Sequence, residues 1–421
     1  MNKRSRKHLV IIGNSGAAIN AVKGIRELDA VSAITIISKE RHRAYAPVLT
    51  TYLISGKADK KKMMLVDKDF YEHNGVRCIN NKKVSCIDTK EQQVILEDGG
   101  SLAYDQVLIA TGASAKCLDV DYPLGAPIFT LRTMEDAENI RNKVPNKGRV
   151  AFYGAGLVSL QVASALAEKL DRMIFVVGSN QILSQNLEPR SAAIVQNRFE
   201  SKGAEFLFGR RIVRIEHGLA ETPVLLHLDD GMTMEVDALI VGKGVRPNIP
   251  EVVPKDAITI GSGIRVDERM ETSTKGVYAA GDVCETREIV SGDYRLIATW
   301  PNACAQGRVA GRNMAGGEIA YIGSMSMNVT SLLGLPFASI GRVREGANGR
   351  QESAFFLDES RDIFKKFTFE GDQLVGAILL GDLKEVASIV PVIRNKISLS
   401  REKKLLMADP ARMARILNGL S

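Results

Sequence analysis

Glycine-rich turns follow short apolar segments at two places in this chain, and such turns let backbone N–H groups approach a phosphate closely. The first turn, residues 13–18, follows residues 9–12, and the second, residues 154–159, follows residues 150–153. The helix that begins at each turn directs its first N–H groups at a pyrophosphate. One such turn is a weak signal, but two turns, each closed by a matching later strand, predict two bound dinucleotides, a flavin and a nicotinamide.

The segments that follow the two turns repeat one order. After the first turn we expect a helix to about residue 28, a strand over residues 33–37 and a closing strand over residues 104–113. After the second turn the matching strands are expected over residues 173–177 and 236–244. This order is typical of a doubly wound α/β unit.

The repeat predicts an α/β protein with two Rossmann-like, three-layer dinucleotide-binding domains and a small C-terminal α+β domain. A chain of 421 residues is long enough for several cores. We expect a discontinuous FAD-binding domain over residues 1–115 and 245–320, an NAD-binding domain over 116–244, and the C-terminal domain over 321–421.

The composition excludes several classes of protein. Aromatic residues make up only 5% and no nucleic-acid-binding signature is present, so no nucleic acid is expected. No apolar run approaches the roughly 20 residues of a membrane helix, and residues 9–12 are too short for a signal peptide core, so we expect a soluble cytoplasmic protein. The net charge of +7 fits either an ordinary solvated surface or a positive face for an acidic partner.

The five cysteines have no spacing that would bind a metal or form a redox dithiol, so no metal is expected. They are Cys78, Cys86, Cys117, Cys284 and Cys304. Scattered cysteines of this kind are usually small buried residues of a protein from a reducing compartment.

Six segments together resemble the FAD/NAD(P)-dependent pyridine nucleotide reductase family, which includes NADH–rubredoxin reductase, the flavin domain of nitrite reductase and ferredoxin reductases. These segments are residues 11–18, 109–114, 131–137, 241–248, 279–283 and 300–307. Residues 13–18 and 44–57 carry a closer resemblance, to the FAD subunits of phenylglyoxylate dehydrogenase and tungsten-containing aldehyde oxidoreductase complexes. The resemblance implies FAD and NAD(H) as cofactors.

The resemblance also implies which residues bind FAD. Glu40 would bind the adenosine ribose, Val84 would meet the adenine, and Asp282 would bind the ribityl chain. Trp300 would lie near the isoalloxazine, and no side chain would be catalytic because the flavin N5 performs the chemistry. The full FAD set is Gly13, Ser15, Gly16, Ala17, Glu40, Val84, Ala110, Thr111, Gly112, Arg132, Gly281 and Asp282.

Purely structural roles remain open for several of these residues, and Asp282 could serve only as a helix cap. Glu40 fits a surface acid beside Lys39, and Val84 fits ordinary strand packing. Arg132 has acids three and four residues ahead of it with which it could pair. Trp300, the only tryptophan, fits a core aromatic.

The nicotinamide site implied by the resemblance departs from the family pattern at two positions. Gln161 stands where relatives carry glutamate, and Gly178 stands where an acid binds the ribose 2′-hydroxyl. A missing acid can indicate NADP, but residues 179–181 supply no cation for a 2′-phosphate, so NAD(H) is favoured and NADP is less expected. The full set is Gly154, Gly156, Ser159, Gln161, Gly178 and Gly244.

Dithiol chemistry is disfavoured, because residues 41–77 contain no cysteine and no histidine follows His227. We therefore expect an FAD-dependent enzyme that passes electrons between NAD(H) and an iron–sulfur protein or subunit. Its expected setting is as the NAD-reducing flavin subunit of an anaerobic multi-subunit oxidoreductase. A stand-alone NADH–rubredoxin or ferredoxin reductase, and a flavin-bearing interaction protein of low turnover, remain alternatives.

A basic stretch near the C-terminus is a candidate docking surface for an acidic iron–sulfur partner. The alternative is that this stretch only closes the small domain. Its basic residues are Lys384, Arg394, Lys396, Arg401, Lys403, Lys404, Arg412 and Arg415.

The residues that follow the second strand of the nicotinamide unit predict that NADH reduces the flavin faster than NADPH at equal concentration. A Gly178→Glu substitution should sharpen that preference, because a carboxylate accepts from both ribose hydroxyls and repels a 2′-phosphate. Stopped-flow measurement of flavin reduction tests both points, and a wild type that prefers NADPH would contradict them.

Overall fold

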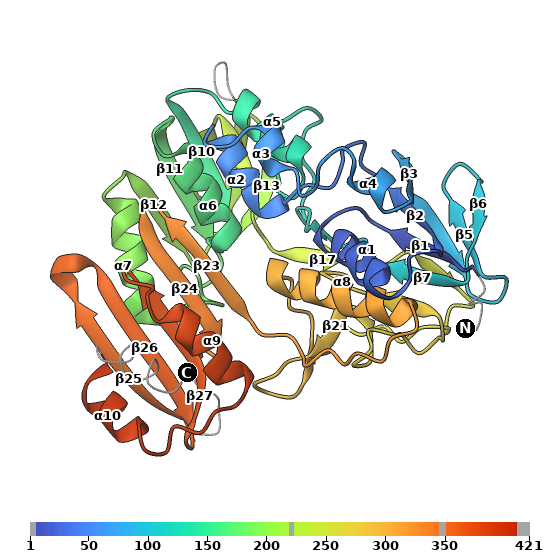
Figure 1. Ribbon diagram of the computed structural model, residues 1–421. Coiled ribbons are helices and arrows are strands. Elements are labelled where there is room, and N and C mark those ends of the chain that lie inside the picture. The colour runs from blue at the N-terminus through green and yellow to red at the C-terminus, as the bar shows by residue number, and fades with distance from the viewer. Residues whose placement is uncertain (1–5, 219–222, 345–350, 411–421) are drawn as a thin grey trace. The chain divides into compact units, whose positions relative to one another are not determined.

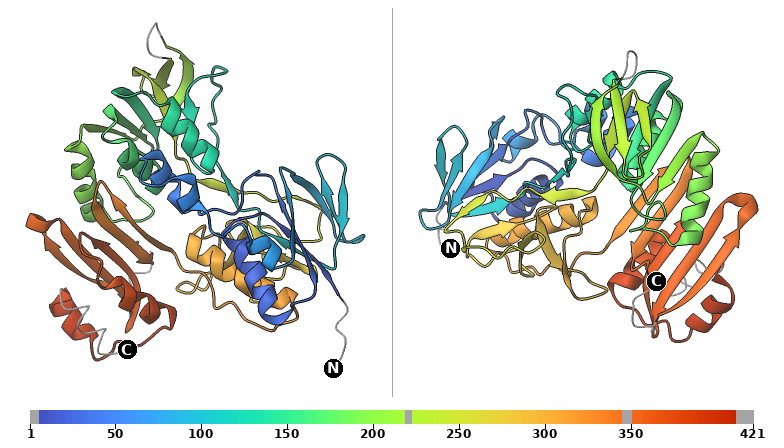
Figure 2. Two further views of the ribbon diagram at one scale, coloured as in Figure 1. Left: turned by 45° about the horizontal axis from the view of Figure 1, so that its top comes forward. Right: turned by 180° about the vertical axis from the view of Figure 1, so that it is seen from behind.

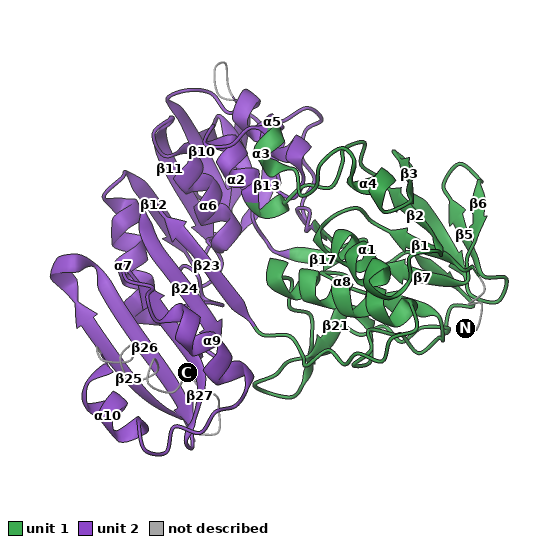
Figure 3. Ribbon diagram, in the orientation of Figure 1, with its two compact units in different colours: residues 1–48, 60–114, 245–325 green, residues 49–59, 115–244, 326–421 purple. Residues whose placement is uncertain are grey.

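The computed structural model describes residues 6–218, 223–344 and 351–410, and the chain divides into two compact units (Figure 3). The first unit comprises residues 1–48, 60–114 and 245–325, and the second comprises residues 49–59, 115–244 and 326–421. Each unit contains a parallel sheet of the doubly wound type, and the second also contains an antiparallel C-terminal sheet. The predicted α/β class is confirmed, whereas the three-domain division stays a prediction.

Five parallel strands form the central sheet of the first unit, in the order β20-β7-β1-β2-β3 (Figure 1). They are β1 (His8–Ile12), β2 (Ala33–Ser38), β3 (Val76–Asn80), β7 (Gln106–Ile109) and β20 (Val277–Ala279). Strand β1 lies in the middle, with residues 9–12 buried. Its unbroken apolar run follows from this position, because a central parallel strand is covered on both faces.

Smaller elements complete the first unit. A four-stranded sheet has the order β18-β4-β5-β6, and a three-stranded sheet has the order β19-β21-β22. The strands are β4 (Val84–Asp88), β5 (Gln93–Leu96), β6 (Ser101–Ala103), β17 (Val245–Pro247), β18 (Glu251–Val253), β19 (Ile264–Arg265), β21 (Cys284–Arg287) and β22 (Tyr294–Arg295). The helices are α1 (Gly16–Leu28), α3 (Lys60–Met63), α4 (Phe70–His73) and α8 (Trp300–Met314).

The second unit repeats this plan with a parallel sheet in the order β12-β11-β10-β16-β9 and a three-stranded meander, β13-β14-β15. The strands are β9 (Ile128–Phe129), β10 (Gly148–Tyr153), β11 (Leu170–Val177), β12 (Ala204–Phe208), β13 (Ile212–His217), β14 (Val224–Leu228), β15 (Thr233–Val236) and β16 (Ala238–Val241). The helices are α2 (Thr50–Ile54), α5 (Met134–Lys143), α6 (Leu157–Leu166) and α7 (Pro189–Glu200). Strand β8 (Ala113–Ala115) lies at the boundary of the units.

The C-terminal part of the second unit is an antiparallel sheet in the order β23-β24-β27-β26-β25, with two helices following it (Figure 2). Its strands are β23 (Met327–Leu332), β24 (Leu335–Gly341), β25 (Gln351–Asp358), β26 (Ile363–Glu370) and β27 (Gln373–Leu380). The helices are α9 (Val386–Arg394) and α10 (Lys403–Ala408). Helix α9 buries Ile389, Val392 and Ile393.

Helices α1 and α8 of the first unit pack with their backbones in contact. A Cβ built on Gly307 of α8 would lie 2.1 Å from the carbonyl oxygen of Ala17, and one on Gly311 would lie 2.1 Å from that of Ala21. On the other side of the contact, a Cβ on Gly24 of α1 would lie 2.4 Å from the carbonyl oxygen of Arg308. Residue numbers rise together along both helices, so the two run parallel and begin at the same end.

A Gly307→Ala substitution tests this contact. The added methyl would meet a backbone carbonyl that cannot rotate away, so we expect the free energy of unfolding to fall by about 1–3 kcal/mol. Thermal and urea unfolding measure the loss. Gly178→Ala is the steric control, because its added Cβ would come no closer than 4.0 Å to another residue. Equal stability of the two variants would contradict the packing described.

Candidate functional site

The turn after β1 has a backbone that glycine adopts readily and other residues do not. Gly13 has a φ of +119°, and its N–H donates to the carbonyl of Ile37 on β2 at 2.8 Å. A Cβ on Gly13 would lie 2.1 Å from the carbonyl oxygen of Ala110, which directly follows β7. The turn therefore lies against the ends of both neighbouring strands and leaves no room for a side chain.

The strand end after β7 is braced by Asn248, a residue from a distant part of the chain. The Thr111 hydroxyl donates to the Asn248 carbonyl at 2.6 Å, and the Asn248 amide donates back to the Thr111 carbonyl at 3.1 Å. The Asn248 N–H donates to the carbonyl of Gly112 at 2.9 Å, and the Ser114 hydroxyl donates to Asn248 Oδ1 at 2.7 Å. These bonds hold Thr111, Gly112 and Ser114 in place after β7.

Helices α1 and α8 begin next to each other, and no described side chain caps either one. Ser15 donates its hydroxyl to the carbonyl of Tyr45 at 3.3 Å, and the buried Oγ1 of Thr299 makes no hydrogen bond in the described chain. The ring of Trp300 lies 2.8 Å from where a Cβ on Gly16 would stand, so the tryptophan packs on the turn. Two parallel, uncapped helix N-termini favour an anion. This arrangement fits the pyrophosphate of a dinucleotide.

The strand end after β20 is held by a buried glutamine of α8. Gly281 has a φ of +85°, and its N–H donates to Gln306 Oε1 at 2.7 Å. Gln306 Nε2 donates to the buried hydroxyl of Ser324 at 3.0 Å, so both ends of the amide are used. A Cβ on Gly281 would meet that of Ala17 at 3.5 Å. The turn that carries Asp282 therefore lies against the first residues of α1.

The other FAD candidates are more dispersed. Glu40 is half-buried after β2 and accepts from the Tyr45 hydroxyl at 2.6 Å, so a ribose would share this carboxylate with a tyrosine. Val84 is buried at the start of β4. Arg132 belongs to the second unit, where its N–H donates to Asp136 in the first turn of α5 at 2.9 Å. Contact of these residues with FAD stays a prediction, as does the place of Trp300 over the isoalloxazine.

The turn after β10 repeats the geometry of the first turn. Gly154 has a φ of +100°, donates to the carbonyl of Val176 at 2.8 Å, and would place a Cβ 2.6 Å from the carbonyl oxygen of Gly242. Gly156 is the N-cap of α6 and offers no side chain to that helix. Ser159 is fully buried, and its Oγ makes no hydrogen bond in the described chain. The α6 N-terminus is therefore also open to an anion.

Two nicotinamide candidates have clear structural roles. The Gln161 amide donates to the Thr330 hydroxyl on β23 at 2.7 Å, which ties α6 to the C-terminal sheet. Gly244 has a φ of +90°, and its carbonyl accepts from the N–H of Lys116 at 3.0 Å. The glycine is required there because other residues rarely adopt that backbone. Neither observation tests a contact with the nicotinamide.

Cations that the sequence argument missed lie near Gly178 and the second turn. Arg210 follows β12, and its N–H donates to the carbonyl before Gly178 at 3.1 Å. Its guanidinium is paired with Asp230 at 2.7 Å. Lys243 Nζ lies 4.1 Å from the ring centre of Tyr153, and burial lowers the pKa of this lysine. Pairing of adjacent parallel strands is the signal that would have placed residues after β12 beside those after β11.

The thiols are poorly suited to redox chemistry. Burial raises the pKa of Cys78 to about 11, and it also raises the pKa of Cys284 and of Cys304. These groups are therefore thiols rather than thiolates at neutral pH. Among the described residues, no group of three or more His, Cys, Asp and Glu side chains could hold a metal ion. No helix in the described ranges has the length and apolar character needed to cross a membrane.

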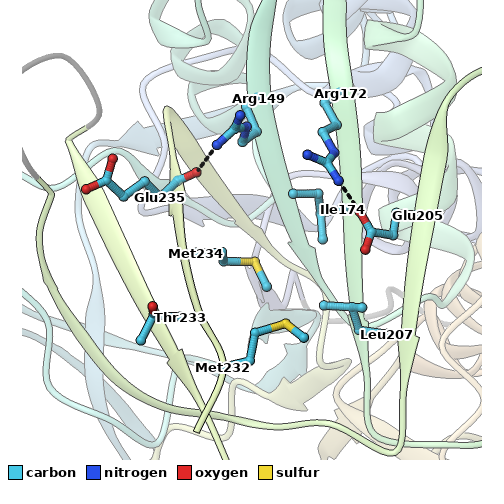
Figure 4. Close-up of a pocket in the computed structure, with 9 residues that line it drawn as sticks. All are labelled: Arg149, Arg172, Ile174, Glu205, Leu207, Met232, Thr233, Met234 and Glu235. Carbon is cyan, nitrogen blue, oxygen red and sulfur yellow. Dashed lines mark hydrogen bonds and ion pairs between the residues drawn. The ribbon is translucent and has the colours of Figure 1, made fainter.

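A separate pocket in the second unit is lined by residues of β11, β12 and β15, and by Arg149 near the start of β10 (Figure 4). Its two arginines are already engaged: Arg149 donates to the carbonyl of Glu235 at 3.3 Å, and Arg172 pairs with Glu205 at 2.6 Å. Gly154 follows the opposite end of β10. The pocket is therefore distinct from the glycine turn, and we assign it no dinucleotide.

Comparison with known proteins agrees with this geometry. Residues 7–307 match the family model described as pyridine nucleotide-disulphide oxidoreductase, and residues 327–397 match the rubredoxin NAD+ reductase C-terminal domain. The chain is 29% identical over 409 residues to the NADH-dependent phenylglyoxylate dehydrogenase subunit epsilon of Aromatoleum evansii, covering 96% of each. It is 28% identical over 311 residues to a rubredoxin-NAD(+) reductase of Pseudomonas putida, covering 73% of this chain and 80% of that protein.

A solved structure and two longer relatives extend the comparison. The structure of the covalent putidaredoxin reductase–putidaredoxin complex matches with a TM-score of 0.89 at 22% identity over 99% of both chains. The chain spans about half the length of two Bacillus subtilis proteins, an assimilatory nitrate reductase electron transfer subunit (51%) and a nitrite reductase (49%).

The chain belongs to the pyridine nucleotide-disulphide oxidoreductase family. It is an FAD-dependent oxidoreductase that uses NAD(H), and its family, enzyme class and cofactors are as predicted from the sequence.

Replacing Gln306 by leucine tests the support of the Gly281 turn. The substitution leaves the buried N–H of Gly281 without an acceptor, which costs about 1–3 kcal/mol of stability. It also frees the turn that carries Asp282 to move, so FAD must order that turn on binding, and we expect about tenfold weaker binding. Titration of the apoprotein with FAD, followed by flavin fluorescence, measures the change. The control is Gln196→Leu on α7, where the amide donates to Glu200 at 2.7 Å in an exposed position. Unchanged FAD affinity in the Gln306 variant would refute the positioning role.

Proposed function

We propose that this chain passes electrons between NAD(H) and an iron–sulfur protein or subunit, as the NAD-reducing flavin subunit of a multi-subunit oxidoreductase. Two similarities support the proposal. The relative from Aromatoleum evansii, matched over nearly its full length, is by name a subunit of an NADH-dependent dehydrogenase. The relative from Pseudomonas putida is by name a rubredoxin reductase.

The observation that carries this proposal is the lack of an internal disulfide acceptor. Residues 41–77 contain no cysteine, and all five cysteines of the chain are free. The five cysteines therefore form no disulfide to which the flavin could pass electrons. An external acceptor or donor is required, and an iron–sulfur centre suits a flavin because it exchanges single electrons.

Bound FAD would supply the chemistry, which is hydride exchange with the nicotinamide and single-electron exchange with the partner. The chain's residues would bind and orient both cofactors. The two parallel helix N-termini at Gly16 and Trp300 would hold the FAD pyrophosphate, and Asp282 would accept from the ribityl hydroxyls. The turn from Gly154 to Ser159 would hold the pyrophosphate of NAD(H).

A stand-alone rubredoxin or ferredoxin reductase is the second candidate. The match of residues 327–397 to the rubredoxin NAD+ reductase C-terminal domain favours it. Purification of the protein from its native source separates the candidates. Recovery in a stable complex with iron–sulfur and substrate-oxidising subunits supports the first, and recovery as a free flavoprotein active with rubredoxin or ferredoxin supports the second.

The basic C-terminal stretch needs a revised interpretation as a docking surface. Lys403 Nζ is paired with Glu352 of β25 at 2.7 Å and donates to the carbonyl of Gly371 at 2.8 Å, so this lysine ties α10 to the sheet. Lys396, Arg401 and Lys404 are exposed. Arg412 and Arg415 lie outside the described residues. A docking role therefore falls on the exposed cations and excludes Lys403.

Charge reversal of Lys396, Arg401 and Lys404 to glutamate tests docking. We expect slower electron transfer to rubredoxin or a [2Fe–2S] ferredoxin, a weaker salt dependence, and unchanged reduction of a dye by NADH. Reversal of Lys90, Lys202 and Lys255, which are also exposed, changes the net charge equally and is the control. If both triple variants behave alike, or if dye reduction falls with rubredoxin reduction, the docking role is wrong.

A further inference from the structure

Lys243 is a cation at the nicotinamide turn and was not among the residues expected to bind NAD(H). It directly follows Gly242, whose carbonyl oxygen lies against Gly154. The Cδ atom of Lys243 lies 3.8 Å from where a Cβ on Gly154 would stand, so the lysine side chain passes beside the first glycine of the turn. Lys243 is an exposed residue, so a ligand at this turn can reach its side chain.

The strand arrangement places Lys243 at the edge of the sheet where a dinucleotide would bind. Strand β16 ends two residues before Lys243, and it pairs in parallel with β10, which ends directly before Gly154. The carboxyl ends of these two strands therefore share one edge of the sheet. Ligands of open α/β sheets bind at this edge.

The ammonium group of Lys243 is held over an aromatic ring rather than by an acid. Its Nζ lies 4.1 Å from the ring centre of Tyr153, whose side chain is buried. No hydrogen bond or ion pair joins this ammonium to another residue in the described ranges. An ammonium has three N–H donors, and a contact with the face of a ring does not use those that point away from it. Lys243 is therefore positioned and still has donors for an acceptor from outside the protein.

The protein alone does not fully compensate the charge of Lys243. Burial lowers the pKa of Lys243, the negative charge of Asp119 raises it, and the positive charge of Arg211 lowers it. The resulting shift is downward, which means that the charged form is less favoured than in water. A bound anion would act in the opposite direction, because it stabilises the charged form of a lysine.

The pyrophosphate of NAD(H) fits this position better than the 2′-phosphate of NADP. Lys243 lies beside Gly154, which begins the turn that would hold a pyrophosphate. The adenosine ribose is expected at Gly178, after β11. The backbone of Arg210 lies beside that glycine, and its guanidinium is already paired with Asp230 at 2.7 Å.

We propose that the Lys243 ammonium binds the pyrophosphate of NAD(H). The inference rests on the proposed function, because it requires the dinucleotide at the turn from Gly154 to Ser159. It adds an ionic contact to the backbone N–H groups of that turn. NADH and NADPH share the pyrophosphate, so this contact would not distinguish between them.

The test measures the binding of NAD+ and of NADP+ to the FAD-loaded, oxidised protein by titration calorimetry. Lys243→Met keeps an unbranched side chain but removes the charge, so it should weaken the binding of both nucleotides by the same factor, about tenfold. The dependence of NAD+ affinity on salt should become weaker as well. Lys243→Arg retains the charge and should lose less affinity than Lys243→Met.

The control is Lys202→Met, which removes an exposed charge two residues before β12, at the opposite edge of the same sheet. Thermal unfolding of each variant controls for folding. A Lys243→Met protein that loses thermal stability but keeps its NAD+ affinity would overturn the proposal, since the lysine would then only pack on Tyr153. A loss confined to NADP+ would also overturn it, by assigning the lysine to the 2′-phosphate, as would an equal loss in Lys202→Met.

Electron transfer to an iron–sulfur partner is measured separately, so the two failures can be distinguished. A protein that binds NAD+ through Lys243 but does not exchange electrons with such a partner contradicts the proposed function and supports this inference. A wild type that binds neither nucleotide contradicts both.

Discussion

The close approach of α1 and α8 is the constraint on which the candidate FAD site depends. Glycines at positions 307 and 311 let one helix backbone lie on the other, with Ala17 and Ala21 at the contact. The helices are parallel, so their dipoles repel, and two positive ends meet at the turn. Ion pairs of Glu27 with Arg308 and Arg312 join the two helices further along. An anion at the N-terminal ends would relieve the repulsion there, and this is the place where the glycine turn of β1 brings a dinucleotide.

The glycine turns of the two units have the same steric restriction. In each, the first glycine of the turn has a positive φ and no room for a Cβ. A Cβ added at Gly13 would collide with the carbonyl oxygen of Ala110, and one added at Gly154 would collide with the carbonyl oxygen of Gly242. Both carbonyls directly follow the strand that pairs with the first strand of the unit. The tight fit explains why glycine stands at both positions, whereas the next small residues, Ser15 and Gly156, are free to differ.

Local signals in the sequence predicted much of this structure, because they depend on backbone geometry over a few residues. The turns at Gly13 and Gly154 and the helix that ends near residue 28 are of this kind. Contacts between distant segments were not predictable from one sequence. Asn248 reaches Thr111 across 137 positions, and the ammonium of Lys243 lies over the ring of Tyr153 at the end of β10. The charge pattern near the C-terminus was also insufficient to identify a docking surface, because it could not show that Lys403 forms an ion pair with Glu352 within the C-terminal sheet.

Hydrogen–deuterium exchange of the apoprotein and of the FAD-loaded protein tests the central claim most directly, since it reports on individual backbone N–H groups in solution. Bound FAD should slow exchange most at the start of α1, residues 14–18, and at the strand end around residues 281–283, because those N–H groups would gain an acceptor or lose access to water. Exchange at the start of α8, residues 300–303, should also slow, but by a smaller factor. Protection elsewhere in the chain, with exchange at these three segments unchanged, would contradict the account.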